Sequence, residues 1–422
     1  MAQIKPFKGI RPVPKYVSRV ATLPYDVYSE KEARDIVSKN PMSFLKIVRP
    51  ETAFPKGTDA YSDKVYEKAA KLIETNIKKG IFTADEDDCY YIYREIMNGR
   101  SQTGLVACFS VDDYLNGVIR KHENTRPDKE DDRTRHIDTC SAQTGLVFMA
   151  FRDEEDIRTI LEQSIHHEPL YEFVSEDNVL QLVWKVDDPD RVARITRAFE
   201  RTGALYIADG HHRAASAATV CQKRRDEHPD YTGDEEFNYF LGVAFPHEEL
   251  KIMPYNRVVA DLNGLSDKLF LELVSRKFEV KKIRGKISKK DREGKAFMPR
   301  TKGEFSMYLG GRWYRLKAKP EIASDDPVKG LDVMILQENI LDPILGIRDP
   351  RTNSRIDFVG GAKGLSELER RCRSDMEAAF ALYPTSMDEL FGVTDRGEVM
   401  PPKSTWFEPK LQSGLFIHKF ES

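Results

Sequence analysis

Apolar and polar positions alternate along the chain in patterns that predict both helices and strands. Over residues 60–79 the apolar positions recur with a helical period, and Gly80 follows as the residue that ends the helix. Ser29 and Glu32 have the spacing of a capping box, which predicts a helix over about 30–39. Two β-rich runs within residues 89–111 flank "NGRSQTG" and predict a hairpin.

The same mixture continues along the rest of the chain. The stretch "NPMSFLKIVRPE" at residues 40–51 predicts a turn into a strand. Further strands are predicted over 145–153, 180–188, 205–209 and 237–246, and helices over 189–200 and 212–227. Past residue 261 the pattern predicts a helix and a strand over 267–283, a hairpin over 303–318, and helices over 332–341, 364–379 and 386–391. Strands and helices without strict βαβ alternation favour an α+β fold, a mixed α/β arrangement.

The length of the chain bears on its domain organisation. A chain of 422 residues exceeds what one hydrophobic core usually organises, so we expect two or three domains. The composition changes near residue 261, and the lysine-rich residues 284–295 are typical of a solvated loop or linker. We predict an N-terminal α/β region over 1–110, a core region over 111–260, and a C-terminal α/β region over 261–422. The tail of the C-terminal region is expected to pack back on the candidate site within the core region.

Composition and charge exclude several classes of protein. The hydrophobic fraction of 40% and the charged fraction of 32% are ordinary for a soluble globular protein, and a net charge of −3 disfavours a dedicated nucleic-acid binder. The first fifteen residues lack the apolar core of a signal peptide, and no apolar run is long enough to span a bilayer. The five cysteines have no CxxC spacing, which indicates reduced thiols. We expect a cytoplasmic protein without a membrane partner.

The stretch "YIADGHHRAA" at residues 206–215 has the strongest candidate chemistry. A strand that ends in Asp-Gly and turns into a helix presents backbone N–H groups to an anion, and Gly210 permits close approach. Arg213 can clamp a phosphate oxygen, and Asp209 can hold Mg²⁺ or accept a proton. His211 and His212 can donate to a phosphoryl group or shuttle a proton. The alternative is an ordinary helix cap with packed histidines, but five such residues in a row favour a phosphate site.

A second candidate lies in "KHENTRP" at residues 121–127, ahead of a dense charge run. His122 and Glu123 place a base beside a carboxylate, and Thr125 and Arg126 can contact phosphate. The alternative is a solvated, charged helix face, which is our interpretation of residues 128–132. For the four residues of the motif we favour a functional role.

A third candidate is the loop "MPPKSTWFEPKLQSG" at residues 400–414. Lys403, Ser404, Thr405 and Lys410 lie between prolines and a glycine, in a composition that suits contact with an oxyanion or phosphate. The loop lacks the glycine spacing of a Walker motif. A C-terminal strand packed on the core is an equally good interpretation.

Two further polar groups are favoured as ordinary surface residues. Asp26, in "LPYDVYS", is either a turn residue or a substrate contact, and we favour the turn. His166, His167 and Glu168 resemble metal ligands in type, but the HExxH pattern of a metal-binding helix is absent.

A family resemblance rests on six stretches that extend over nearly the full length: "LPYDVYS", "NPMSFLKIVRPE", "KHENTRP", "ADGHHRAAS", "LQENILDPILGI" and "PPKSTWFEPKLQSGL". Through them the chain resembles a widespread bacterial family, formerly a domain of unknown function and often labelled SpoOJ/ParA/ParB/RepB-like. The junction at residues 209–213 resembles the signature loop of the ParB/sulfiredoxin superfamily, where this turn binds nucleotide phosphates. Its Asp-Gly-His variant is similar to that of free-serine kinases.

The resemblance implies a ParB/sulfiredoxin-like nucleotide-binding core with additional α/β subdomains. It implies a phosphotransferase that acts on free L-serine or O-phospho-L-serine, in either direction, with ADP or ATP and Mg²⁺. In such an enzyme Asp209 and Glu123 share catalysis, Asp209 also holds the metal, and His211 or His212 stabilises the transferring charge. The residues then expected at the phosphates or nucleotide are Gly210, Arg213, His122, Thr125, Arg126, Lys403, Ser404 and Thr405.

Other activities within the superfamily stay open as alternatives. Sulfiredoxin chemistry is disfavoured, because it needs a cysteine in the loop and the nearest one, Cys221, lies further along the helix. ParB proteins carry Gly-Glu-Arg-Arg in the loop and a helix-turn-helix, whereas this chain has Asp-Gly-His-His-Arg and no evident basic recognition helix. A nucleotide-binding regulator that binds CTP or ATP without catalysis is the main alternative, and a DNA-binding ParB-like protein is the least favoured.

Overall fold

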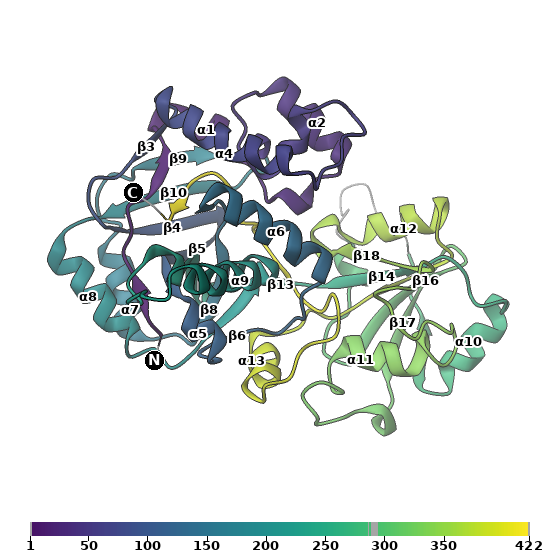
Figure 1. Cartoon of the computed structure of the whole chain (residues 1–422). Helices are drawn as coiled ribbons and strands as arrows, with labels where there is room; N and C mark the ends of the chain where they lie inside the picture. Colours follow the sequence, from purple (N-terminus) through teal and green to yellow (C-terminus); the bar gives the residue numbers. More distant parts are fainter. Residues whose placement is uncertain (1, 286, 288–293, 421–422) are drawn as a thin grey trace. The chain divides into compact units, whose positions relative to one another are not determined.

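A computed structural model describes residues 2–285, 287 and 294–420 of the chain. The chain divides into two compact units, one formed by Met1–Leu250 with Pro409–Ser422 and one by Lys251–Glu408. We call them unit 1 and unit 2 (Figure 1). The expected boundary at 260/261 lies close to the start of unit 2, and the expected boundary at 110/111 falls within unit 1.

Unit 1 is built on a mixed, nine-stranded sheet. The strand order is β6-β11-β8-β12-β5-β4-β10-β9, and β1 pairs with β5 beside this path. Two pairs, β11 with β6 and β12 with β8, are parallel and the others are antiparallel. In chain order the strands are β1 (Ile4–Lys5), β4 (Tyr90–Met97), β5 (Arg100–Ser110), β6 (Ile119–Arg120), β8 (Val147–Phe151), β9 (Tyr171–Val174), β10 (Leu180–Val186), β11 (Leu205–Asp209) and β12 (Tyr239–Pro246).

The central strands of this sheet are buried along their whole length. Every residue of β8 and β12 is buried, as expected for strands covered on both faces. Helices α6 and α9 contact each other and run side by side across the sheet in Figure 1. The helices that follow the first sheet strands are α5 (Val111–Leu115), α6 (Pro127–Cys140), α7 (Glu155–Gln163), α8 (Pro189–Phe199) and α9 (His211–Glu227).

The N-terminal segment of unit 1 forms a second hydrophobic cluster. Its helices are α1 (Val17–Val20), α2 (Glu30–Lys39), α3 (Leu45–Val48) and α4 (Asp63–Lys78). The strand predicted within residues 40–51 is wrong, because this segment forms α3 and a 3-10 turn, Pro50–Ala53. Ile47 and Val48 have strong β propensity, but burial in this cluster overrides it in so short an apolar run.

Residues 409–420 return from unit 2 and complete unit 1. Strand β21 (His418–Lys419) pairs with β7 (Ala142–Gln143), and Ile417 bridges to Ile10 beside the pair formed by β2 (Ile10–Pro12) and β3 (Phe82–Ala84). A second bridge joins Ser413 to Thr22. This returning segment brings Lys410 to the end of β11, as described below.

Unit 2 contains a six-stranded antiparallel sheet in the order β15-β17-β16-β19-β14-β18. A separate pair joins β13 to β20. The strands are β13 (Ile252–Met253), β14 (Tyr255–Val259), β15 (Phe278–Lys282), β16 (Glu304–Leu309), β17 (Arg312–Ala318), β18 (Ile356–Gly360), β19 (Ala378–Ala381) and β20 (Trp406–Phe407). The helices are α10 (Asp267–Ser275), α11 (Asp332–Leu336), which continues as a π-helix to Leu341, α12 (Leu365–Ser374) and α13 (Met387–Asp395).

The mixed α/β character expected from the sequence is confirmed in both units. The capping box of Ser29 and Glu32 and the hairpin of β4 and β5 are present. The helix predicted to residue 379 ends at Ser374, because residues 378–381 form β19, a buried strand between β14 and β16. Most of the lysine-rich stretch 284–295 lies outside the described residues. No helix in the described ranges has the length and apolar character that crossing a membrane requires.

Candidate functional site

The turn from β11 into α9 forms the centre of the candidate site. The pairing of β11 with β8 shifts register between Ile207 and Asp209, where the strand ends. Gly210 follows in the left-handed region with φ +94°, which is open to glycine at little cost. The Asp209 carboxylate accepts a hydrogen bond from the Gly210 N–H at 2.7 Å. The turn therefore presents a carboxylate directly beside the start of a 17-residue helix.

The helix start has the features of an anion site. The N–H groups of its first turn have no acceptor within the helix and lie at the positive end of the helix dipole. Arg213, in this turn, donates from Nη1 to the Leu146 carbonyl oxygen. A Cβ atom at Gly210 would lie 3.1 Å from Nε of Arg213, so glycine also leaves room for the guanidinium.

Asp209 is paired with Lys410 from the returning C-terminal segment. Lys410 Nζ lies 2.8 Å from Asp209 Oδ2, and the two side chains are 16% and 31% exposed. Burial by itself raises the pKa of Asp209, but the charges of Lys410 and Arg213 outweigh burial and hold that pKa well below its usual range. Asp209 is therefore ionised at neutral pH, and its partner lies 201 residues away in the chain.

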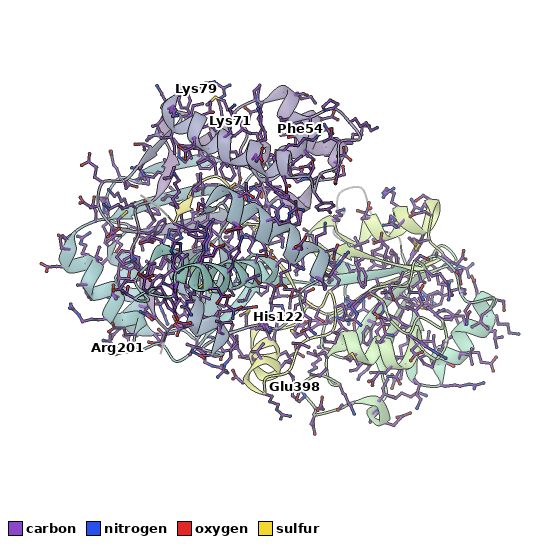
Figure 2. All side chains as sticks on the ribbon, viewed as in Figure 1. Phe54, Lys71, Lys79, His122, Arg201 and Glu398 are labelled. Carbon is purple, nitrogen blue, oxygen red and sulfur yellow. The ribbon has the colours of Figure 1, made fainter. Side chains whose placement is uncertain are left out.

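The two adjacent histidines hold the loop that contains "KHENTRP". His211 Nε2 accepts from the His122 N–H at 3.4 Å, and His212 Nε2 accepts from the Arg126 N–H at 3.0 Å. The rings of His122 and His211 meet edge to face, with centroids 4.4 Å apart. His122, labelled in Figure 2, therefore lies close to the N-terminal end of α9.

All three of these histidines are kept neutral. Burial lowers the pKa of His122 to about 4 and the pKa of His211 well below its usual value. Burial also lowers the pKa of His212, against the opposing charges of Asp26 and Glu130. A neutral ring accepts a backbone N–H, whereas an imidazolium has no lone pair for it. His211 and His212 can therefore hold the loop only while their rings are neutral.

The structure brings some residues of the loop to the site and directs others away from it. Glu123 is half-buried within the attached loop. Thr125 donates from Oγ1 to Glu130 at 2.7 Å, and Arg126 pairs at 2.9 Å with Asp128 on an exposed surface. The side chains of Thr125 and Arg126 thus contact acids of α6, and their predicted contact with phosphate stays a prediction.

A shallow pocket opens beside Arg213, and the empty space of about 510 Å³ in and around it includes open solvent. Its lining includes the buried guanidinium of Arg133, the ring of Tyr25 and the polar Gln143. Arg133 lies 4.3 Å from the centre of the Tyr25 ring and pairs with Asp132 at 2.8 Å. The interpretation of residues 128–132 as wholly solvated is wrong, because Asp132 is buried and accepts from Arg133.

Sequence reasoning did not identify Arg133 or Tyr25, and it favoured Asp26 as a turn residue. Arg133 lies in a run of charged residues, where the sequence gives no sign that its side chain is buried. The 3-10 turn Tyr25–Val27 contains Asp26, whose charge opposes the burial that lowers the pKa of His212. The charge effect places Asp26 near the site, and the proline-tyrosine context was the only signal in the sequence.

The described residues hold no prepared metal site. No three His, Cys, Asp or Glu side chains in the described ranges gather as metal ligands. Both carboxylate oxygens of Asp209 already accept, one from Gly210 and one from Lys410. A Mg²⁺ ion on Asp209 would lie beside the Lys410 ammonium, whose positive charge opposes it, so the residues do not fit a preformed magnesium centre. Magnesium binding by Asp209 stays a prediction.

The three candidates of the loop 400–414 that precede Lys410 belong to unit 2. Ser404 is buried and donates from Oγ to the Pro401 carbonyl oxygen at 2.5 Å. Lys403 is exposed, and its Nζ lies 5.5 Å from the centre of the Tyr255 ring. Thr405 is half-buried. A contact of these residues with phosphate stays a prediction.

Comparison with known proteins gives one family and several distant structures. Residues 4–334 match the family described as "Protein of unknown function (DUF1015)". Among curated proteins, none matches the chain.

Three solved structures illustrate the distant likeness. SbnI from Staphylococcus aureus, with a C-terminal truncation, is 12% identical, with 74% of this chain and 87% of that one covered and a TM-score of 0.38. A free serine kinase in complex with AMP is 13% identical, with 72% and 86% covered and a TM-score of 0.31. A conserved hypothetical protein from Pyrococcus furiosus is 15% identical, with 74% and 95% covered and a TM-score of 0.32. Identities and TM-scores this low transfer neither a fold nor a function.

Proposed function

Because the chain belongs to the DUF1015 family, whose description assigns no activity, we propose a function from the site itself. We propose that unit 1 transfers a phosphoryl group between a nucleotide, ADP or ATP, and free L-serine or O-phospho-L-serine. In this proposal residues 209–213 form a phosphate-binding loop of the ParB/sulfiredoxin type, which they resemble in sequence. The observation that carries it is the ionised Asp209, held by Lys410 at the N-terminal end of α9.

The helix start and Arg213 bind the phosphates in this proposal. Backbone N–H groups at a helix N-terminus and a guanidinium stabilise the charge that spreads over the transferring oxygens. The pocket beside Arg213 takes the small anionic substrate, since Arg133 also borders it. The choice of substrate rests on the resemblance of residues 209–213 to the loop of free-serine kinases.

In the direction of serine phosphorylation, the serine hydroxyl oxygen attacks the terminal phosphorus of the nucleotide. The bond from that phosphorus to its bridging oxygen breaks, and the shortened nucleotide leaves with the electron pair. The hydroxyl proton passes to a carboxylate, Asp209 or Glu123. The reverse reaction breaks the phosphoserine ester by the same steps. His211 and His212 act here as positioning residues, because their Nε2 atoms hold the loop that contains Glu123.

Phosphorus NMR of the purified full chain tests the proposal. One mixture contains O-phospho-L-serine with and without ADP, and the other contains L-serine with ATP or ADP, each with Mg²⁺ added. We expect a new nucleotide or phosphate resonance with the wild type. The rate at which this resonance grows should fall by orders of magnitude in D209N. The matched control is D128N, which removes an exposed carboxylate of α6. No phosphate transfer in either mixture would refute the activity, and full turnover in D209N would remove Asp209 from it.

A nucleotide-binding regulator without catalysis is the second candidate. The loop alone supports it, since anion binding at a helix start needs no general base. It predicts tight nucleotide binding that is independent of serine and tolerant of E123Q. The same mixtures with and without serine separate the two candidates, and retention on duplex DNA at physiological salt would indicate the DNA-binding alternative.

A further inference from the structure

Unit 2 contains a buried guanidinium that has no anionic partner. Arg257, on β14, is 3% exposed. It donates from Nη1 to the Tyr255 carbonyl oxygen and from Nη2 to the Pro402 carbonyl oxygen, the latter at 3.3 Å. In the part of the chain that the structure describes, no carboxylate pairs with it. A guanidinium has five N–H donors, so three remain for another acceptor.

The surroundings of Arg257 make this charge unfavourable by itself. In the sheet register Arg257 lies opposite Phe358 on β18 and opposite Phe380 on β19, so its neighbours on that face are aromatic. Its guanidinium lies 5.4 Å from the centre of the Phe358 ring. Burial lowers the pKa of Arg257 to about 10. Buried charges in proteins are normally paired, and an unpaired one calls for an explanation.

The turn that accepts from Arg257 also presents a second cation. Lys403 follows Pro402 directly, and its ammonium group lies over the Tyr255 ring. The backbone carbonyl oxygen of the same Tyr255 accepts from Arg257. Lys403 has φ +57°, an unusual conformation for a residue with a side chain. Strained backbone of this kind is concentrated at binding and catalytic sites.

Two hydroxyl groups hold this turn in place. Ser404 donates from Oγ to the Pro401 carbonyl oxygen at 2.5 Å, and Thr385 donates to the Ser404 carbonyl oxygen at 3.1 Å. The Trp406 ring lies against Gly360, where a Cβ atom would be 2.9 Å away, and meets the Tyr255 ring edge to face at 5.1 Å. The turn is thus fixed on both sides, and Lys403 is its exposed member.

We propose that Arg257 and Lys403 form an anion-binding site of unit 2 that accepts a phosphate monoester or inorganic phosphate. Arginine binds phosphate oxygens through paired donors, and lysine adds a point charge. Two cations beside aromatic rings match a doubly charged anion better than a single charge. This site lies within unit 2, so its binding of phosphate does not depend on phosphate transfer by unit 1.

Titration calorimetry of the full chain with inorganic phosphate tests the site. We expect R257Q to weaken the affinity by roughly ten- to a hundred-fold, as for loss of a hydrogen bond to a charged group, and K403M to weaken it as well. The matched control is R315Q, since Arg315 is a half-buried arginine of the same sheet that pairs with Glu304. Separate titrations with O-phospho-L-serine and ADP identify the preferred source of the phosphate group.

The site of unit 1 must be distinguished in the same experiment. R213Q removes the guanidinium in the first turn of α9, so phosphate bound there is lost in that variant and retained in R257Q. Unchanged affinity in both R257Q and K403M, or no binding of any of the three ligands to the wild type, would overturn the proposal. K403M changes an exposed side chain and keeps the test decisive if R257Q does not fold. Loss of phosphate binding in R257Q without any serine phosphotransfer by the wild type would leave this site standing and the proposed activity refuted.

Discussion

Replacement of His122 by glutamine should make unit 1 less sensitive to acid. His122 has a pKa of about 4 in the folded chain, against an ordinary value near 6.5, so it stays neutral in the fold while the unfolded chain takes up a proton. As the pH falls below about 6.5 the unfolded state binds more protons, and the free energy of unfolding decreases until the pH reaches the folded pKa. At pH 5 this single group lowers the free energy of unfolding by about 2 kcal/mol relative to pH 7.

Hydrogen exchange of peptides from β11 and α9, followed against urea concentration at pH 7 and pH 5, measures this difference for unit 1 alone. We expect the decrease between the two pH values to be smaller in H122Q than in the wild type by about 2 kcal/mol. H167Q, which removes an exposed histidine, is the control and should follow the wild type. An equal decrease in H122Q and the wild type would refute the reasoning that His122 is buried in the neutral form.

Three further changes test the site and its supports. G210A should destabilise unit 1 by about 1–2 kcal/mol in urea unfolding, because φ +94° is strained for alanine and the new methyl group presses on Arg213; a stability equal to the wild type would contradict this. K410M should raise the pKa of Asp209 toward its ordinary range, which carbon NMR of the carboxylate measures; an unchanged titration would mean that the ion pair is not formed in solution. S29A should cost about 1 kcal/mol and increase exchange in the first turn of α2, where Glu32 completes the cap, with no effect expected on turnover.

Elements whose determinants are close in the sequence were predictable. The capping box of Ser29 and Glu32 and the hairpin over residues 89–111 depend on contacts within a few positions, and both are present. The segment 40–51 depends on its burial in the N-terminal cluster, which no local pattern shows, so β propensity was misleading there.

In the candidate site, too, features with local determinants were predictable and long-range contacts were not. The residue types at 209–213 indicate a candidate site, and the turn into α9 lies where it was predicted. The pairing of Asp209 with Lys410 joins positions 201 apart, so the sequence shows two candidates without their contact. Arg257 gives no sequence signal, because an arginine within a strand is notable only once its surroundings are known to contain no carboxylate.

The return of residues 409–420 to unit 1 has a consequence for the order of events during synthesis. Asp209 leaves the ribosome 201 residues before Lys410, and β7 is complete long before β21 exists to pair with it. The segment that forms unit 2 emerges in between, with all of its strands and helices. A nascent chain can therefore form most of unit 2 while Asp209 still lacks its cation, and the turn from β11 into α9 acquires its final charge balance only afterwards.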